Sequence, residues 1–203
     1  MKPLIATPCY DGKVCINYFI SIAQLNPVPE IIAPSGALVT YARNDCVARF
    51  MAGNWSHLFF IDSDIGFEPA AFWRVLASGY DVAAGVYLHR IEGETSNGGF
   101  VGDFSELGPV GEDGFAVTAD ASTGFMCIAR PVFERMSAAG IGRHEFFDTM
   151  RSGDEYIAED AAFCKRWRAL SGLIHLDTRS TLTHQGVKFY QRDFGAYLEG
   201  RAK

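Results

Sequence analysis

Positive charge is scarce in this sequence. Its 203 residues include 18 Lys and Arg against 24 Asp and Glu, which gives a formal net charge of −6. A protein that binds an extended nucleic-acid duplex needs a basic face to displace phosphate counterions, and an anionic membrane surface attracts polybasic segments. The composition therefore disfavours both partners, and we predict that the protein does not bind nucleic acid.

Long hydrophobic runs are missing as well. No apolar run approaches the roughly 20 residues that a bilayer-spanning helix needs. The N-terminal segment turns polar after a few residues. The sequence therefore predicts no signal peptide and no integral membrane segment.

Cysteines are few and follow no pattern. They are odd in number, widely spaced and free of any CxxC or Cys/His cluster: Cys9, Cys15, Cys46, Cys127 and Cys164. This spacing fits neither a disulfide framework nor a structural zinc site. We interpret these residues as reduced thiols, and we predict a cytoplasmic protein.

The chain does contain enough apolar side chains for one sizeable core. Hydrophobic residues make up 48% of it, and its length predicts a single domain over 1–203. In the first half, short apolar runs alternate with stretches of helical period. The expected strands are 4–6, 30–33, 57–61 and 80–86, and the expected helices are about 14–25, 39–52 and 68–78. This alternation predicts an α/β fold with a mixed, mostly parallel sheet flanked by helices.

The second half is less regular. Glycines among acidic and hydroxyl residues predict a loop or irregular hairpin over 89–114, and a second loop over 140–158. The expected strands are 115–118, 124–129, 173–176 and 181–184, and the expected helices begin at Arg130 and near Glu159. The second of these helices would end at a left-handed cap formed by Gly172.

Two carboxylates follow the apolar segment Leu-Phe-Phe-Ile at 58–61, namely Asp62 and Asp64. In an open α/β sheet, ligands bind beyond the carboxyl ends of the strands. Two such close carboxylates repel each other unless a cation or a hydrogen-bond donor compensates them. A hard divalent ion carried by a diphosphate is a natural compensator, because it takes one or two carboxylates plus phosphate oxygens as ligands. The plain alternative is a turn in which both acids cap the loop and the following helix.

A second acidic pair, Glu159 and Asp160, opens the last long helix. Acids in the first turn also interact favourably with the helix dipole, by about 0.3–1 kcal/mol, so the pair has an ordinary structural explanation. A Gly-rich loop precedes the pair, and Phe163, Trp167 and Leu170 follow at the spacing of one helix face. That setting makes the two acids candidates for chemistry.

Six short motifs occur in a fixed order along the chain. They are Thr7 with Pro8, Ala-Arg-Asn at 42–44, Phe-Ile-Asp-Ser-Asp at 60–64, Thr-Gly-Phe-Met at 123–126, Glu159 with Asp160, and His-Gln-Gly at 184–186. Together they resemble the glycosyltransferases of the A-type fold, the nucleotide-diphospho-sugar transferases. The chain looks most like the small family-2-like members of bacteria, large viruses and phages. The resemblance implies a Rossmann-like sheet, with a nucleotide-binding part over about 1–100 and an acceptor-side part over about 101–203.

For the donor side, the resemblance implies that Thr7, Pro8 and Tyr10 line the nucleotide pocket. It further implies that Arg43 contacts the nucleotide or its phosphates and that Asp62 meets the ribose or a metal-bound water. An ordinary explanation of Arg43, as a solvated helix residue, also stays open.

For the metal and the base, the resemblance implies that Asp64 ligates Mn²⁺ or Mg²⁺ directly, with Asp62 beside it, and that His184 completes the metal shell. Alternatively, His184 merely ends a strand with a backbone hydrogen bond. Asp160 would act as general base on an acceptor hydroxyl, and Glu159 would support it or contact the acceptor.

The implied reaction moves a sugar from a nucleoside-diphosphate sugar, a UDP- or GDP-sugar, to a glycan or another hydroxyl acceptor. The metal ion would stabilise the departing diphosphate as a Lewis acid. The assignment of Asp160 as base favours inversion at the anomeric carbon.

Two other functions fit parts of the sequence. Residues 61–64 also resemble the nucleophile loop of haloacid-dehalogenase-like phosphatases, in which Asp62 would attack phosphorus and Asp64 would protonate the leaving group. However, that loop usually follows the first strand and continues with Gly-Thr, whereas Ile65 and Gly66 follow here. The third candidate is a non-catalytic nucleotide- or glycan-binding module, which would have no reason to keep all four of Asp62, Asp64, Asp160 and His184.

Overall fold

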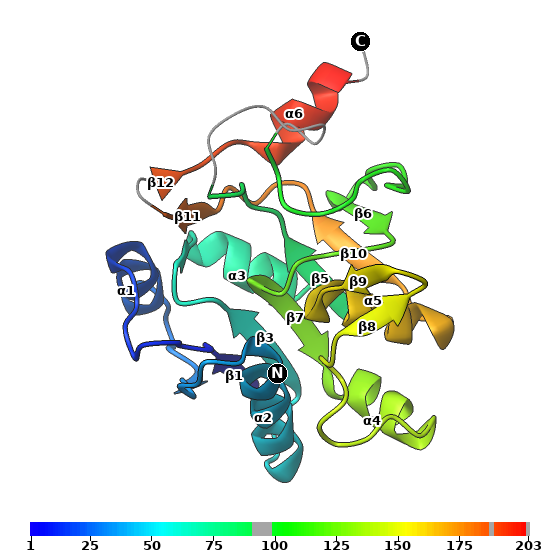
Figure 1. Ribbon diagram of the computed structural model, residues 1–203. Helices are drawn as coiled ribbons and strands as arrows, with labels where there is room; N and C mark the ends of the chain where they lie inside the picture. Colours follow the sequence, from blue (N-terminus) through cyan, green and yellow to red (C-terminus); the bar gives the residue numbers. More distant parts are fainter. Residues whose placement is uncertain (91–98, 187–188, 202–203) are drawn as a thin grey trace.

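A seven-stranded sheet with helices on both faces forms the centre of the protein, as the computed structural model shows for residues 1–90, 99–186 and 189–201 (Figure 1). From edge to edge its strands are β2 (Glu30–Ile32), β1 (Pro3–Ala6), β3 (His57–Ile61), β7 (Phe125–Ala129), β5 (Val82–Gly85), β10 (Ile174–Asp177) and β6 (Phe115–Thr118). Five of them run in one direction, and β7 and β6 run against them. The sheet is therefore mixed and mostly parallel, which confirms the predicted fold class.

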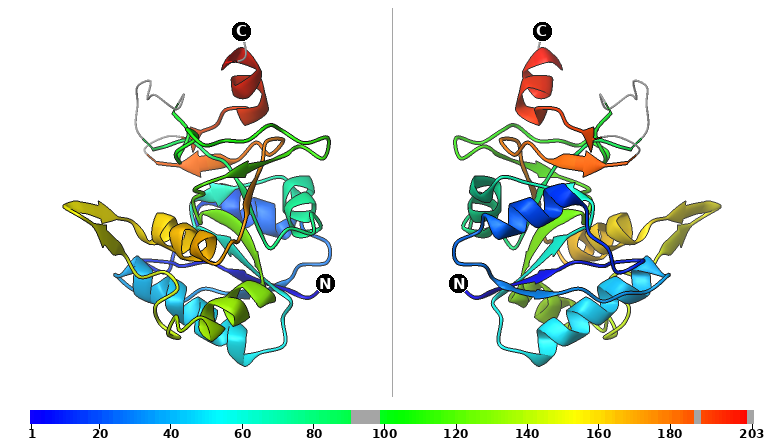
Figure 2. Two further views of the ribbon diagram at one scale, coloured as in Figure 1. Left: turned by 90° about the vertical axis from the view of Figure 1, so that its right-hand side faces the viewer. Right: turned by 90° about the vertical axis from the view of Figure 1, so that its left-hand side faces the viewer.

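Six helices accompany the sheet in the described part of the chain: α1 (Ile16–Ala23), α2 (Val39–Ala52), α3 (Pro69–Leu76), α4 (Arg130–Ala138), α5 (Glu159–Ala169) and α6 (Phe194–Arg201). One apolar cluster joins the sheet to α2, α4 and α5, and a second joins its other face to α1 and α3 (Figure 2). None of these helices combines the length and the hydropathy that a bilayer crossing requires.

Strand β3 shows why the two layers form. Its side chains alternate, so that Leu58 and Phe60 belong to the cluster with α2, and Phe59 and Ile61 belong to the cluster with α3. All four are fully buried, and each buried apolar side chain of this size contributes about 1.5–3 kcal/mol. The apolar run ends at Ile61, and the chain then reaches the carboxyl edge of the sheet.

The agreement between predicted and observed elements differs along the chain. The bounds of α2 and β3 are those expected from the sequence, whereas β5 is shorter than the predicted strand at 80–86. Four short strands were not predicted: β4 (Ile65–Gly66), β8 (Met150–Ser152), β9 (Glu155–Ile157) and β12 (Phe189–Tyr190). β8 and β9 form a hairpin inside the predicted loop at 140–158. Most of their side chains are exposed, so no buried face marks them in the sequence.

The predicted Gly-rich loop at 89–114 has an ordered base. Leu88 pairs with Phe100 in an antiparallel bridge, and the His89 amide donates to the Gly99 carbonyl. The residues between them, 91–98, lie outside the described part. On the other side, the Phe100 ring contacts Phe194 of α6, with ring centroids 4.9 Å apart. The last helix thus packs against the base of this loop.

The end of α5 corrects one prediction. Ser171, and not Gly172, adopts the left-handed conformation, with φ of 61°. Gly172 lies against the ring of the fully buried Trp167, where an added Cβ would be 2.1 Å from the ring atom Cε2. Glycine is therefore required at residue 172 for close packing rather than for its backbone angles.

Gly172→Ala is expected to destabilise the fold, because the enclosed Trp167 ring cannot move away from the new methyl group. We expect the free energy of unfolding to fall by about 1–3 kcal/mol, the usual cost of overpacking, measured by urea denaturation. Gly200→Ala is the matched control, since a Cβ at Gly200 meets nothing within 4 Å. Equal stabilities of the two variants would contradict the packing argument.

Candidate active site

A cavity of about 280 Å³ opens at the carboxyl ends of β1 and β3. Its lining comes from the segment after β1, the start of α2, the turn after β3, and Arg90: Pro8, Cys9, Tyr10, Gly36, Ala37, Val39, Ala42, Arg43, Asp62, Ser63, Asp64 and Arg90. Four of the five residues expected at the donor side, together with the expected metal ligand Asp64, thus share one cavity. Thr7 does not line it, because its fully buried hydroxyl lies 2.6 Å from the hydroxyl of Tyr18.

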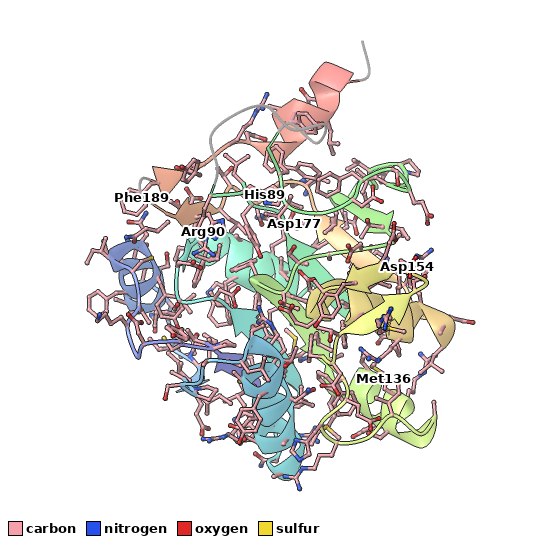
Figure 3. The ribbon with its side chains drawn as sticks, in the orientation of Figure 1. His89, Arg90, Met136, Asp154, Asp177 and Phe189 are labelled. Atoms are coloured by element: carbon pink, nitrogen blue, oxygen red, sulfur yellow. The ribbon has the colours of Figure 1, made fainter. Side chains whose placement is uncertain are left out.

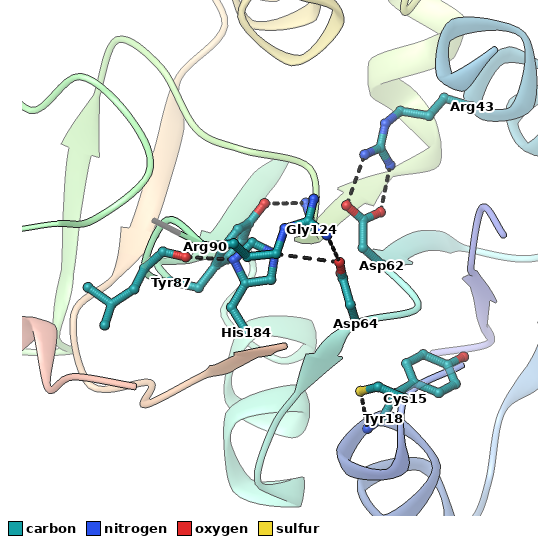
Figure 4. A network of polar contacts seen from close by, with 10 residues as sticks. Cys15, Tyr18, Arg43, Asp62, Asp64, Tyr87, Arg90, Gly124 and His184 are labelled. Carbon is teal, nitrogen blue, oxygen red and sulfur yellow. Dashed lines mark hydrogen bonds and ion pairs between the residues drawn. The ribbon is translucent and has the colours of Figure 1, made fainter. Parts of the chain in front are cut away.

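Arg43 is buried and binds two carboxylates, of which Figure 4 shows that of Asp62. Its Nη1 and Nη2 donate to the two oxygens of Asp62 at 3.1 and 3.2 Å, and its Nε donates to Oε1 of Glu159 at 3.3 Å. Burial disfavours the charged guanidinium, but both carboxylates outweigh that effect and raise the pKa of Arg43. The guanidinium therefore stays charged and joins the end of β3 to the start of α5.

The neighbouring Asn44 belongs to the Ala-Arg-Asn motif, but the sequence analysis gave it no role. Its side-chain amide donates to the His144 carbonyl at 2.6 Å and to Asp148 at 2.9 Å, and its oxygen accepts the Phe147 amide at 3.0 Å. Asn44 is 2% exposed. The Ala-Arg-Asn motif thus fixes two things at once: Arg43 holds the acids, and Asn44 holds the segment that leads to the β8–β9 hairpin.

Asp64 lies beside His184, although the two are far apart in the sequence. The short strand β11 (Thr183–Gln185) pairs with β4, so that His184 lies opposite Ile65. The Gln185 amide also donates to the Asp64 carbonyl at 2.9 Å. As a result, Nε2 of His184 lies 3.6 Å from Oδ2 of Asp64 (Figure 4).

The imidazole of His184 is oriented by its other nitrogen. Nδ1 lies 2.6 Å from the Leu88 carbonyl, and because a carbonyl can only accept, Nδ1 is the donor. Nε2 therefore faces Asp64: it donates to the carboxylate when it carries a proton, and without that proton it would offer its lone pair to a metal ion, as a metal-binding histidine does. Tyr87 packs its ring edge-on against His184 at 5.0 Å.

The charge of Asp64 is also compensated by Arg90. Nη1 of Arg90 donates to Oδ2 of Asp64 at 2.7 Å. Burial opposes ionisation of Asp64, but its contacts with His184 and Arg90 outweigh burial and hold the pKa of Asp64 below its ordinary value. Asp64 is therefore ionised at neutral pH.

The side chains around Asp64 determine whether a divalent ion can bind there. In the described residues, no group of three or more His, Cys, Asp or Glu side chains converges to hold a metal. Asp64 and His184 form a pair of donors, while both oxygens of Asp62 bind Arg43. Two protein donors suit an ion whose remaining ligands come from a bound diphosphate.

Asp160 and Glu159 begin α5, as expected from the sequence, but their surroundings differ. Glu159 pairs with Arg43, whereas Oδ1 of Asp160 accepts the Ala161 amide at 2.8 Å. Burial raises the pKa of Asp160, and the nearby carboxylate of Asp120 adds to the increase. Asp120 was not predicted as part of the site. Asp160 is thus a stronger base than an ordinary aspartate.

Gly124 has a steric role that involves a residue missed in the sequence. Its amide donates to the Tyr87 hydroxyl at 3.2 Å, and an added Cβ would lie 2.3 Å from that oxygen. Its carbonyl accepts the Asp62 amide at 3.0 Å. The group that approaches Gly124 closely is therefore the phenol of Tyr87. In the sequence, only the position of Tyr87, two residues after the end of β5, could have indicated its contact with Gly124.

Comparison with known proteins shows a shared fold and no shared family. No protein-family model matches the sequence, and no curated protein does. Among solved structures, A197 from STIV has a TM-score of 0.61 and 18% sequence identity over 95% of this chain and 94% of that chain. The chain therefore shares the fold of A197 over nearly its whole length.

Two further solved structures match more loosely. Apo UDP-glucose pyrophosphorylase has a TM-score of 0.42 and 12% identity, covering 86% of this chain and 66% of that one. Residues 1–349 of TarS from S. aureus give a TM-score of 0.44 and 12% identity, covering 87% of this chain and 58% of that one.

Arg43→Met is expected to lower the free energy of unfolding by about 3 kcal/mol, because Asp62 and Glu159 would remain partly buried without their cation. The change keeps a side chain of similar helix propensity. In the control Arg49→Met, an exposed pair with Asp45 is lost, and we expect a cost below about 1 kcal/mol. Urea denaturation measures both, and equal costs would show that Arg43 does not hold the site together.

Proposed function

We propose that the protein is a glycosyltransferase that moves a sugar from a nucleoside-diphosphate sugar to an acceptor hydroxyl with the help of Mn²⁺ or Mg²⁺. The observation that carries the proposal is the pair formed by Asp64 and His184 beside the cavity, with the imidazole oriented by Leu88. The ordered motifs of the sequence support the same function. The cavity lies where ligands bind in open α/β sheets.

Asp64 through Oδ2 and His184 through Nε2 would hold the divalent ion. When bound, such an ion supplies Lewis-acid stabilisation of the negative charge that develops on the departing diphosphate. Leu88 keeps His184 in the tautomer with a free Nε2. Pro8 and Tyr10, which line the cavity, would contact the nucleotide.

On the acceptor side, Asp160 would take the proton of the attacking hydroxyl onto a carboxylate oxygen. Its raised pKa makes it a better proton acceptor near neutral pH than an ordinary aspartate. Glu159 is held by Arg43, so the backbone that carries Asp160 is fixed relative to Asp62. A base placed in this way favours a single displacement with inversion.

The phosphatase alternative is less well supported by this geometry. A phosphatase of that type needs a free carboxylate at Asp62 to attack phosphorus, yet both oxygens of Asp62 accept hydrogen bonds from Arg43. A binding module would bind the donor without any turnover, including slow hydrolysis, and assays of turnover separate it from an enzyme.

Binding of UDP or GDP is expected to strengthen with Mn²⁺, because diphosphate oxygens and the Asp64–His184 pair would share the ion. Calorimetric titration with Mn²⁺ and with EDTA measures the difference. Asp64→Asn should abolish it, whereas His184→Ala should weaken it and be partly rescued by more Mn²⁺. Asp45→Asn, a change of equal charge outside the cavity, should behave as wild type. Equal nucleotide affinity with and without chelator in the wild type would contradict the proposal.

Asp160→Asn is expected to lower sugar transfer, or slow donor hydrolysis, on the order of 10²–10⁴-fold, the usual scale for losing a positioned base. Binding of UDP or GDP with Mn²⁺ should stay unchanged. In the wild type, activity should fall as pH falls through the raised pKa of Asp160, because the protonated acid cannot accept a proton, and this acidic limb should vanish in the variant. Rescue of Asp160→Asn by added metal would mean that its role was misassigned.

A further inference from the structure

Arg90 shares the oxygen of Asp64 that the proposed ion would use. Its Nη1 lies 2.7 Å from Oδ2, and Nε2 of His184 lies 3.6 Å from the same atom (Figure 4). In the conformation seen here, Arg90 therefore supplies the positive charge that compensates Asp64. A cation that ligates Oδ2 competes with Arg90 for this carboxylate, because two positive charges at one oxygen repel each other.

The two arginines that line the cavity differ in how firmly their side chains are held. The side chain of Arg43 is 4% exposed and makes three hydrogen bonds to two carboxylates, whereas that of Arg90 is 55% exposed. Exposed ion pairs of this kind contribute little to stability. Arg90 can therefore change partners at small cost, and Arg43 cannot.

The backbone at Arg90 allows such a change without refolding. The preceding residues are anchored, since His89 donates its amide to Gly99 and Leu88 bridges to Phe100. Gly186 lies beside the stem of Arg90, where an added Cβ would be 3.1 Å from the Cβ of Arg90. Figure 3 shows Arg90 next to His89 and far from Met136 of α4, at the end of the molecule where β11 lies. Only the long side chain needs to move.

We propose that Arg90 is an exchangeable counter-ion of Asp64. Without ligands it pairs with Asp64; when a divalent ion arrives with a nucleoside diphosphate, it gives up Asp64 and donates to the diphosphate oxygens instead. The planar guanidinium suits this exchange, because it binds carboxylate and phosphate oxygens in the same bidentate manner. This inference rests on the proposed function and adds a positioning role for a residue that no sequence motif marked.

The exchange couples metal and nucleotide binding. Mn²⁺ alone has to displace Arg90 and leave it without a partner, whereas Mn²⁺ with the diphosphate provides Arg90 with a new one. Each ligand therefore increases the affinity for the other. Removing Arg90 should strengthen the binding of Mn²⁺ alone and weaken the binding of the nucleotide in its presence.

The test is a titration of Mn²⁺ followed by electron paramagnetic resonance, without nucleotide and with UDP or GDP, combined with calorimetry of the nucleotides. For Arg90→Gln we expect Mn²⁺ alone to bind on the order of fivefold more tightly, and UDP or GDP with Mn²⁺ on the order of tenfold more weakly. Arg90→Lys, which keeps the charge, should bind Mn²⁺ alone as the wild type does. Arg49→Gln removes an equally exposed arginine from an Asp pair outside the cavity and should change neither affinity.

Two results would overturn the inference and are distinguishable from failure of the proposed function. If Arg90→Gln bound Mn²⁺ alone no more tightly than the wild type, or kept its nucleotide affinity, the exchange would be refuted while the metal dependence of the wild type still stood. If the nucleotide affinity of the wild type ignored Mn²⁺, the proposed function would fail, and the inference with it.

Discussion

The ion pairs of the buried Arg43 guanidinium fix the positions of Asp62 and Glu159 relative to each other. A charge that leaves water must be paired and hydrogen-bonded, and Arg43 meets that demand with Asp62 at the end of β3 and Glu159 at the start of α5. Because these residues come from different layers, the sheet and the helix cannot shift separately without leaving the charge uncompensated. The position of Asp160 on α5 follows from this constraint.

Two neighbouring aspartates are compensated in different ways. Asp62 is held by a buried partner with no freedom, while Asp64 faces an oriented imidazole and an exposed arginine. Two of the shortest strands, β4 and β11, bring His184 to Asp64. The first acid therefore keeps the architecture rigid, and the second remains available for exchange of its partners. A site that binds and releases a charged ligand needs both properties.

Much of the fold and part of the candidate site could be predicted from local patterns in the sequence. The predicted bounds of α2 and β3 agree with the structure, and the rule that ligands bind beyond strand ends correctly predicted that Asp62 and Asp64 lie at a cavity. Strand β7, inserted between β3 and β5, depends on long-range pairing that no local period encodes. The roles of Asn44 and Tyr87 depend on contacts with residues far away in the sequence. The hairpin of β8 and β9 could not be predicted, because most of its side chains are exposed and no alternation of apolar residues marks it.

A short relay of contacts connects α6, the last helix among the described residues, with His184 of the candidate site. Phe194 packs on Phe100, Phe100 bridges to Leu88, and the Leu88 carbonyl holds the imidazole of His184. Shortening the chain before Phe194 would remove a ring from this relay and loosen the tautomer control of a histidine that it never touches. The C-terminal helix therefore supports the candidate site without contacting His184, through the packing of Phe194 on the base of the loop.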